Sequence, residues 1–275
     1  MRCARAAAVV VVALLAGCHR VSRDEPLTYR ASPTLYVHDG FEQKKLSGAW
    51  ARDRFEEDAV TMESSVVRAG KQAVAVTVRS HDKFEAGRDG DLDTERDELR
   101  EDTQLFAKEN VPYETSFSMY FPTDFPVVPV RLVIAQWKQY CGSETSECSN
   151  QSPVLALRYV NGELLVTQAL DKEHHTIYRQ KGEFRGRWLD FKFRYRFTPG
   201  PDGHVAVWFD GKQVVDLHGV TADAEGTGTG YPVEGANHFF FKMGLYRDLM
   251  PQPMTVYIDE YRKTELIPQD GAKAR

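Results

Sequence analysis

The sequence predicts an all-β protein, an antiparallel β-sandwich, on three observations. No apolar stretch keeps a 3.6-residue period beyond one or two turns. The dipeptides Asn161-Gly162 and Asp210-Gly211 each separate two apolar segments, as in tight β-hairpins. Alternation with a period of two marks residues 72–79, 114–121 and 189–197, and residues 238–246 and 254–261 complete the set of predicted strands. Roughly a dozen strands without alternating helices indicate one sandwich domain.

Composition places the chain among folded proteins and excludes one class of partner. The 275 residues are 42% hydrophobic and 27% charged, which is typical of a globular chain and not of a disordered one. Lys and Arg number 35 against 40 Asp and Glu, for a net charge of −5. General basicity therefore cannot drive nucleic-acid binding, and we expect no nucleic-acid partner. We expect a monomer.

The N-terminus resembles a bacterial lipoprotein signal peptide. Arg2 and Arg5 precede an apolar run, residues 6–16, that is too short to span a bilayer. The run ends in Leu-Ala-Gly-Cys, so residues 1–17 are predicted to be removed and Cys18 to be lipidated. His19, rather than Asp, follows the cysteine, which favours the outer membrane, with the domain facing the periplasm or the cell surface. An ordinary signal peptide remains the alternative, and both predict export.

The rest of the chain divides into a tether, the domain and a tail. Residues 18–34 are polar and read as a tether, residues 35–266 form the predicted sandwich, and residues 267–275 form a flexible tail. Cys141 and Cys148 have six residues between them. In an oxidising compartment such a pair predicts a disulfide within a loop.

The first candidate functional strand is residues 95–101. In a sandwich, one sheet can be concave, and outward side chains then line a groove. The period of two places Arg96, Glu98 and Arg100 on one face and Leu99 on the other. Two guanidiniums beside one carboxylate suit the binding of acidic sugars, although a solvated charge ladder would look the same.

The second candidate strand is residues 132–139. The strand begins with apolar residues and ends with Gln136 and Lys138, which share a face. An amide and an ammonium there could bind a carboxylate, or the strand could simply become polar as it reaches solvent.

The third candidate strand is residues 239–247. Lys242, Gly244 and Tyr246 share a face, and the glycine is expected to leave space above the sheet where a ligand could approach. The Lys242 ammonium is expected to favour the ionised form of the Tyr246 phenol.

Together the three segments resemble the β-jelly-roll polysaccharide lyases, closest to the heparin lyase I-like family and more distantly to alginate and glucuronan lyases. The alginate lyases carry Arg-x-Glu-Leu-Arg, Gln-x-His and Tyr-Phe-Lys-x-Gly-x-Tyr strands. The matching segments here are residues 96–100, 136–138 and 240–246, within a resemblance that covers residues 37–263. The resemblance implies a jelly-roll, concanavalin-like sandwich with a concave substrate groove.

The resemblance also implies β-elimination on a uronic-acid polysaccharide. An enzyme of this kind neutralises the uronate carboxylate, removes the C5 proton and protonates the leaving C4 oxygen. The implied catalytic residues are Tyr246, Lys242, Gln136 and Arg96. The implied substrate-binding residues are Arg100, Glu98, Lys138, Arg247 and His175. Tyr246 would act as the acid, while Gln136 with Arg96 or Arg100 would neutralise the carboxylate.

One residue departs from the alginate lyase pattern. Lys138 stands where those enzymes carry His. Either Tyr246 performs both proton transfers, or a histidine arrives from elsewhere in the chain. The candidates are His81, His174, His175 and His238.

No cofactor is required by this chemistry, and a structural Ca2+ is an open alternative. Asp39, Glu42 and Asp259 lie near the two ends of the domain, and hard carboxylate oxygens suit calcium. Surface acids are common without an ion, so the metal content is left unknown.

Two other functions compete with a lyase at the cell envelope. The Lys138 substitution favours a non-catalytic, carbohydrate-binding envelope lipoprotein of the same fold. A retaining glycoside hydrolase would need two carboxylates on one strand, in the order Glu-x-Asp-x-x-Glu. Residues 95–100 end in Arg100 at the last position, which argues against the hydrolase.

Overall fold

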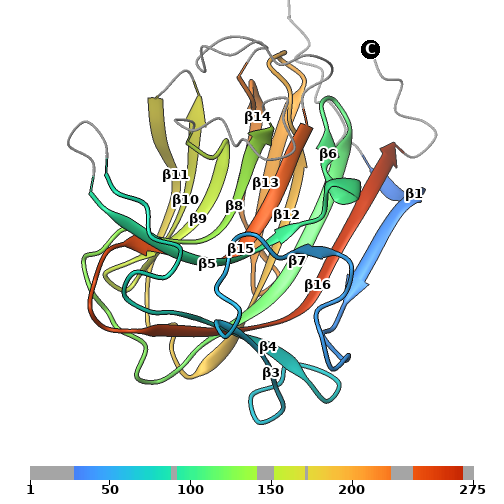
Figure 1. Ribbon diagram of the computed structural model, residues 1–275. Helices are drawn as coiled ribbons and strands as arrows, with labels where there is room; N and C mark the ends of the chain where they lie inside the picture. Colours follow the sequence, from blue (N-terminus) through green and yellow to red (C-terminus); the bar gives the residue numbers. More distant parts are fainter. Residues whose placement is uncertain (1–27, 88–91, 141–151, 171–172, 224–237, 269–275) are drawn as a thin grey trace, which may run out of the picture.

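Two antiparallel sheets of eight strands each stack into a sandwich (Figure 1). The structure is a computed structural model that describes residues 28–87, 92–140, 152–170, 173–223 and 238–268. Cys18, Cys141, Cys148 and the predicted signal peptide lie outside these residues. The described part contains one short 3-10 turn, Thr103–Leu105, and no α-helix, which confirms the predicted all-β class. None of its segments is a helix with the length and hydropathy needed to cross a membrane.

The strand order brings together segments that are far apart in sequence. The first sheet runs β14 (Lys212–Gly219), β13 (Gly203–Phe209), β12 (Arg187–Arg196), β7 (Pro112–Phe121), β16 (Met254–Pro268), β4 (Ala73–Val78) and β3 (Val60–Glu63), with β1 (Tyr29–Asp39) also paired to β16. The second sheet runs β11 (Glu173–Lys181), β10 (Glu163–Leu170), β9 (Leu155–Val160), β8 (Leu132–Tyr140), β15 (His238–Asp248), β5 (Thr94–Glu101) and β2 (Trp50–Ala51), with β6 (Ala107–Lys108) paired to β15.

The first and last strands lie side by side (Figure 1). β1 begins at Tyr29, inside the segment expected to be a tether, and Tyr29 pairs with Pro268. The edge of β16 offers unpaired backbone donors and acceptors, and these draw residues 29–39 into the sheet. β16 itself extends to Pro268, two residues beyond the expected end of the domain.

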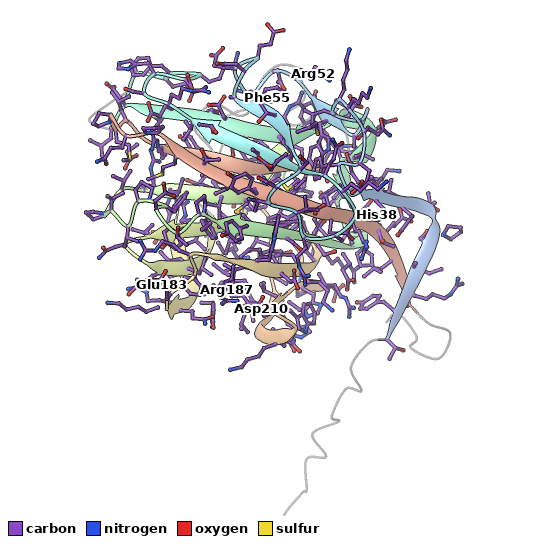
Figure 2. All side chains as sticks on the ribbon, turned by 90° about the horizontal axis from the view of Figure 1, so that it is seen from below. His38, Arg52, Phe55, Glu183, Arg187 and Asp210 are labelled. Atoms are coloured by element: carbon purple, nitrogen blue, oxygen red, sulfur yellow. The ribbon has the colours of Figure 1, made fainter. Side chains whose placement is uncertain are left out.

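The two predicted hairpin turns are confirmed by their backbone angles. Asn161 and Gly162 have φ of 50° and 79°, and Asp210 and Gly211 have φ of 47° and 77°. Positive φ at both central residues is the geometry of a two-residue hairpin whose twist matches its strands. At the second turn, Arg187 Nη1 lies 2.8 Å from Asp210 Oδ2, and both residues are labelled in Figure 2.

Aromatic side chains fill the space between the sheets. The Trp137 ring centroid lies 4.6 Å from that of Phe193 and 4.7 Å from that of Phe241, and all three side chains are fully buried. Trp137 and Phe241 belong to the second sheet and Phe193 to the first, so this cluster joins the layers. Aromatic pairs add about 0.5–1.5 kcal/mol each beyond the burial of their area.

Candidate functional site

The three candidate strands are neighbours in the second sheet, as the order β8-β15-β5 shows (Figure 1). Their register places opposite one another the pairs Tyr246–Arg96, Gly244–Glu98, Lys242–Arg100 and Lys242–Gln136. Because paired residues in antiparallel strands point to the same face, one face of this sheet collects the predicted side chains. We call this outward face the groove face.

The floor of the groove face is a buried cluster around Glu98. The Gln136 amide donates a hydrogen bond to Glu98 Oε1, and Lys242 Nζ lies 3.3 Å from Glu98 Oε2. Glu98 is 1% exposed, Gln136 2% and Lys242 0%. These side chains hold one another in place beneath the surface. Lys138, on the same face as Gln136, is 9% exposed.

The expected pairing of Lys242 with Tyr246 does not form. Four residues along a strand separate two Cα atoms by about 13 Å. Lys242 instead contacts Glu98, as described above. The charges that act on Tyr246 come from neighbouring elements: the Arg96 guanidinium carbon lies 4.2 Å from the Tyr246 ring centroid, and that of Arg131 lies 5.4 Å from it. Tyr246 is partly exposed.

Arg131 and Arg158 complete a cationic cluster that sequence reasoning missed. Arg158 on β9 pairs with Val133, which in turn pairs with Tyr246. Burial, followed by repulsion from Arg131, lowers the pKa of Arg158 to about 10. The Arg158 Nε donates to Thr167 Oγ1 at 3.0 Å. A lone arginine in the apolar strand Leu155–Val160 was the signal that could have identified it.

Anionic partners restrain this cluster. Arg96 pairs with Glu85, and its Nη1 lies 3.7 Å from Glu98 Oε2. Arg131 Nη2 lies 2.6 Å from Asp248 Oδ1, and Arg131 Nε donates to the same oxygen at 2.7 Å. Tyr246 and Asp248 both raise the pKa of Arg158, whereas Arg131 lowers it. Arg96, Arg131 and Arg158 thus surround Tyr246, with Glu85 paired to Arg96 and Asp248 paired to Arg131.

His174 and His175 lie on opposite faces of β11. His174 pairs with Ala169 and His175 with Gln168. Ala169 shares its face with Thr167, the hydrogen-bond partner of Arg158, so His174 points to the groove face. Burial, followed by repulsion from Arg158, lowers the pKa of His174, which keeps the imidazole neutral near pH 7. His175, expected to bind substrate, faces the other way.

The other expected site residues are distributed as follows. Arg100 lies at the margin of the groove face with its Nε 3.1 Å from Asp53 Oδ1. Arg247 is fully buried on the core side, with Nη2 2.7 Å from Glu95 Oε1, so its guanidinium is out of reach of a groove ligand. His238 begins β15, about 26 Å along the strand from Tyr246. His81 lies outside the strands, with Nδ1 2.9 Å from Ser80 Oγ.

Gly244 has a structural role that differs from the one expected. Its φ is 137°, and a Cβ at this position would lie 2.5 Å from the backbone oxygen of Asp97. The glycine therefore allows β5 to approach β15 closely at this backbone angle. Room for a ligand does not explain it.

The three carboxylates considered for calcium accept hydrogen bonds from the protein. Asp39 Oδ2 accepts from Ser47 and Trp50, and Glu42 Oε1 accepts from the backbone of Lys71. Asp259 Oδ2 accepts from the backbone N–H groups of residues 68 and 69. Among the described residues these three do not converge as a ligand cluster.

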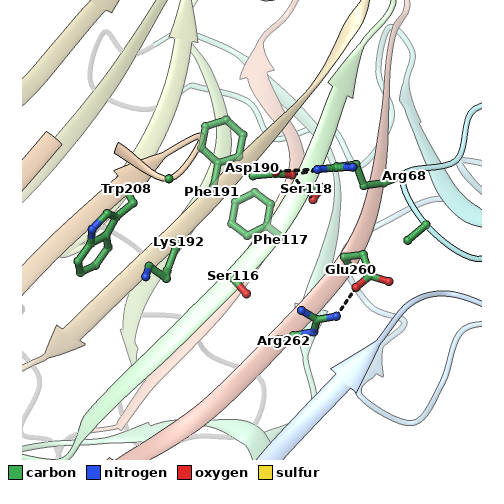
Figure 3. Close-up of a pocket in the computed structure, with 12 residues that line it drawn as sticks. Arg68, Ser116, Phe117, Ser118, Asp190, Phe191, Lys192, Trp208, Glu260 and Arg262 are labelled. Carbon is green, nitrogen blue, oxygen red and sulfur yellow. Dashed lines mark hydrogen bonds and ion pairs between the residues drawn. The ribbon is translucent and has the colours of Figure 1, made fainter. Parts of the chain in front are cut away.

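A second hollow lies on the outward face of the first sheet and has a different character. Its volume is about 460 Å³, and four of the five charged side chains that line it form ion pairs, while Lys192 lies over the Trp208 ring (Figure 3). Arg68 Nη2 lies 2.9 Å from Asp190 Oδ2, and Ser118 Oγ donates to Asp190 Oδ1 at 2.7 Å. Arg262 pairs with Glu260. On the groove face, the arginines lie around a tyrosine, and Glu85, Glu98 and Asp248 are their anionic neighbours.

Comparison with known proteins agrees with this geometry. A model of the polysaccharide lyase family matches residues 37–262. A comparison of the sequence with curated proteins finds no match. Among solved structures, the chain is similar to the endo-β-1,4-glucuronan lyase of the fungus Trichoderma reesei, with a TM-score of 0.57 and 16% identity over 84% of this chain and 94% of that one.

Two further structures show the same fold. A family 7 alginate lyase bound to its product matches with a TM-score of 0.53 and 12% identity, over 77% of this chain and 85% of that one. The cellulose-induced protein Cip1 matches with a TM-score of 0.52 and 12% identity, over 83% and 96%. At these identities the likeness establishes the shared jelly-roll fold. A heparin lyase I-like subfamily is not among the findings.

Proposed function

The chain belongs to the polysaccharide lyase family, and on that premise we propose that it cleaves a uronic-acid-containing polysaccharide by β-elimination at the groove face. The observation that carries this proposal is the cluster of Arg96, Arg131 and Arg158 around the partly exposed Tyr246. It supplies positive charge for a carboxylate beside a group that can transfer a proton.

The first requirement of β-elimination is stabilisation of the uronate carboxylate. Removal of the C5 proton moves negative charge onto that carboxylate, and fixed positive charges lower the energy of this state. We assign the binding of the carboxylate to Arg131 and Arg158. Their mutual repulsion lowers the pKa of Arg158, and a bound anion between them would relieve it.

The second requirement is a proton for the leaving C4 oxygen. The Tyr246 hydroxyl is assigned this role, since the phenolate formed after transfer is stabilised by the guanidiniums of Arg96 and Arg131. The buried residues Glu98, Gln136 and Lys242 fix Arg96 and the strand beneath it, as positioning residues.

The third requirement is a base for the C5 proton. We assign it to His174, whose neutral imidazole faces the groove and lies within the electrostatic influence of Arg158. This replaces the histidine that the alginate lyases carry at the position of Lys138. If His174 does not reach the sugar, Tyr246 performs both proton transfers.

The test is the ultraviolet absorbance of the unsaturated uronate that β-elimination creates. The purified protein is incubated with glucuronan, alginate, heparin and a neutral glucan as the control. Glucuronan and alginate come first, because they are the substrates named for the structurally similar lyases. Absorbance that rises with one uronic-acid polymer and is absent with the neutral glucan supports the proposal; cleavage without the absorbance would make the enzyme a hydrolase.

A non-catalytic, carbohydrate-binding protein of the same fold is the second candidate. Lys138 on the floor of the groove favours it, because this residue cannot act as the missing imidazole base. Affinity electrophoresis on the same polymers separates the two. Retarded migration on a uronic-acid polymer without any product would establish binding alone.

The location is also proposed. The Leu-Ala-Gly-Cys sequence supports lipidation of Cys18 and attachment to the outer membrane, and export supports a disulfide between Cys141 and Cys148. Cys18→Ser should move the protein from the membrane fraction to the soluble fraction. Unchanged fractionation would contradict the lipid anchor.

A further inference from the structure

The hairpin formed by β13 and β14 carries two histidines and an aspartate on one face, far from the groove. His204 and His218 are directly opposite each other in the register of the two strands. Asp216 lies two residues before His218 on the same strand and therefore on the same face. The register set at the turn shifts by one residue between Val207 and Trp208, and beyond that irregularity His204 and His218 are opposite each other. The backbone therefore holds the three side chains together before any ligand arrives.

The ligand atoms of the three side chains converge. His204 Nε2 lies 2.7 Å and His218 Nε2 lies 3.3 Å from Asp216 Oδ1. All three ligand atoms lie within 4.8 Å of one another, and no other group of three His, Cys, Asp or Glu in the described part of the chain does this. Two ligands of a tetrahedral zinc ion, each about 2.1 Å from the metal, are roughly 3.4 Å apart. Small side-chain rotations reach that spacing.

We propose that His204, His218 and Asp216 bind one divalent transition-metal ion, such as zinc, on the outward face of the β13–β14 hairpin. Two imidazoles and one carboxylate suit zinc and its neighbours in the first transition series, whereas calcium prefers oxygen ligands alone. Water completes the coordination. The proposal is independent of the lyase activity and of the calcium site considered above.

Charge and access both favour the site. The side chain of His204 is 18% exposed, that of His218 69% and that of Asp216 56%, so a metal ion can enter from solvent. Arg194 on the adjacent strand is the nearby cation, and its charge is balanced by Glu114 at 2.8 Å.

The bound metal would fasten an edge strand. Among the described residues, β14 is the last strand of its sheet and is hydrogen-bonded on one side only. A metal held by His204 on β13 and by His218 and Asp216 on β14 would cross-link the two strands. Binding to the folded state alone should raise the melting temperature.

The test uses metal-depleted protein and two probes, Zn2+ by calorimetry and Co2+ by its visible absorption. We expect one ion per chain, bands typical of cobalt with nitrogen ligands, and a higher melting temperature with Zn2+ but not with Ca2+. His218→Ala and Asp216→Asn should each weaken Zn2+ binding at least tenfold, and circular dichroism confirms that both variants are folded. Their side chains are exposed, so folding should survive.

The matched control is His38→Ala. His38 also pairs with a carboxylate, at 3.3 Å from Glu260, but has no second histidine opposite it. This variant should keep wild-type Zn2+ affinity. Absence of binding, binding that survives both His218→Ala and Asp216→Asn, or equal loss in His38→Ala would each overturn the proposal.

Discussion

The Arg96 guanidinium lies over the face of the Tyr246 ring, 4.2 Å from its centroid, and the two residues are directly opposite each other on β5 and β15. This contact joins a charge to the one group on the groove face that we assign to proton donation. It also identifies the substitution with the clearest expected effect.

Tyr246→Phe removes only a hydroxyl and should lower kcat by about 10²–10⁴, the usual contribution of a general acid or base. The ring remains between Arg96 and Arg131, so KM and polymer binding should change little. The measurement is the rate of unsaturated product formation. Tyr36→Phe, at an exposed position on β1, is the control. Full activity of Tyr246→Phe would remove this residue from the mechanism.

Arg158→Gln should raise KM and also lower kcat, because the charge that it removes both binds the carboxylate and stabilises the negative charge that develops on it. The difference in KM between variant and wild type should become smaller at high ionic strength, because salt also screens the attraction between the polymer and the wild-type protein. Initial rates over a range of polymer and salt concentrations check this. Arg187→Gln, which removes the pair with Asp210 of the β13–β14 turn, should behave as the wild type. An equal effect in this variant would argue against a local role for Arg158.

His174→Gln should remove the acidic limb of the pH–rate profile. An imidazole accepts a proton only in its neutral form, so wild-type activity should rise as pH increases through the pKa of His174. Burial and Arg158 place that pKa below 6.5, its ordinary value. The profile of kcat/KM from pH 4 to 8 is the measurement, with His38→Gln as the control. If His175→Gln removes the limb instead, the assigned face of β11 is wrong.

Glu101→Gln should destabilise the fold strongly. Lys263 Nζ donates to both oxygens of Glu101, at 3.0 and 2.8 Å, and both residues are fully buried. Removing one partner leaves a buried charge without a counterion and costs about 3–5 kcal/mol of unfolding free energy. Denaturant unfolding measures this. Glu183→Gln, which removes an exposed pair with Arg185, should have little effect.

Asp97→Asn should flatten the pH dependence of stability. Burial raises the pKa of the Asp97 carboxyl to about 8 in the folded protein, while the unfolded chain titrates near its ordinary value of about 4. Between these values the folded state holds a proton that the unfolded state releases. Stability therefore falls as pH rises in this window, by about 1.4 kcal/mol per pH unit from this group.

Unfolding free energies of wild type and Asp97→Asn at pH 5.5 and 7.5 measure the effect. The asparagine resembles the protonated acid and does not titrate, so the difference between the two pH values should be smaller in the variant. An equal difference in both proteins would show that Asp97 is already ionised in the folded state.

The strands that alternate in sequence were predictable because one of their faces is buried against the other sheet. β7, β12 and β13 carry that alternation clearly, and the groove-facing side of β5 followed from it. β11 lies at a sheet edge and is exposed along most of its length, so burial imposes no pattern on it. β1 was missed because its pairing with β16 depends on a partner more than two hundred residues away.

The sequence predicted which strands form the site, but it predicted less well which side chains contact one another there. Periodicity showed that Lys242 and Tyr246 share a face; it did not show that Lys242 reaches across to Glu98 on the next strand. Arg131 and Arg158 come from outside the three motif segments, and only the strand order of the second sheet brings them beside Tyr246. Pairing between strands is a long-range property, and local alternation does not encode it.

The position of β16 also governs when this protein can fold. Its residues pair with β1, β4 and β7, which makes the last strand the common neighbour of strands from the first half of the chain. A nascent chain lacks that strand, so its first sheet cannot close until nearly the whole sequence has been synthesised. Such distant contacts slow folding. A shortened chain that ends before Met254 should therefore accumulate as a protease-sensitive species, because three strands would be left with open edges.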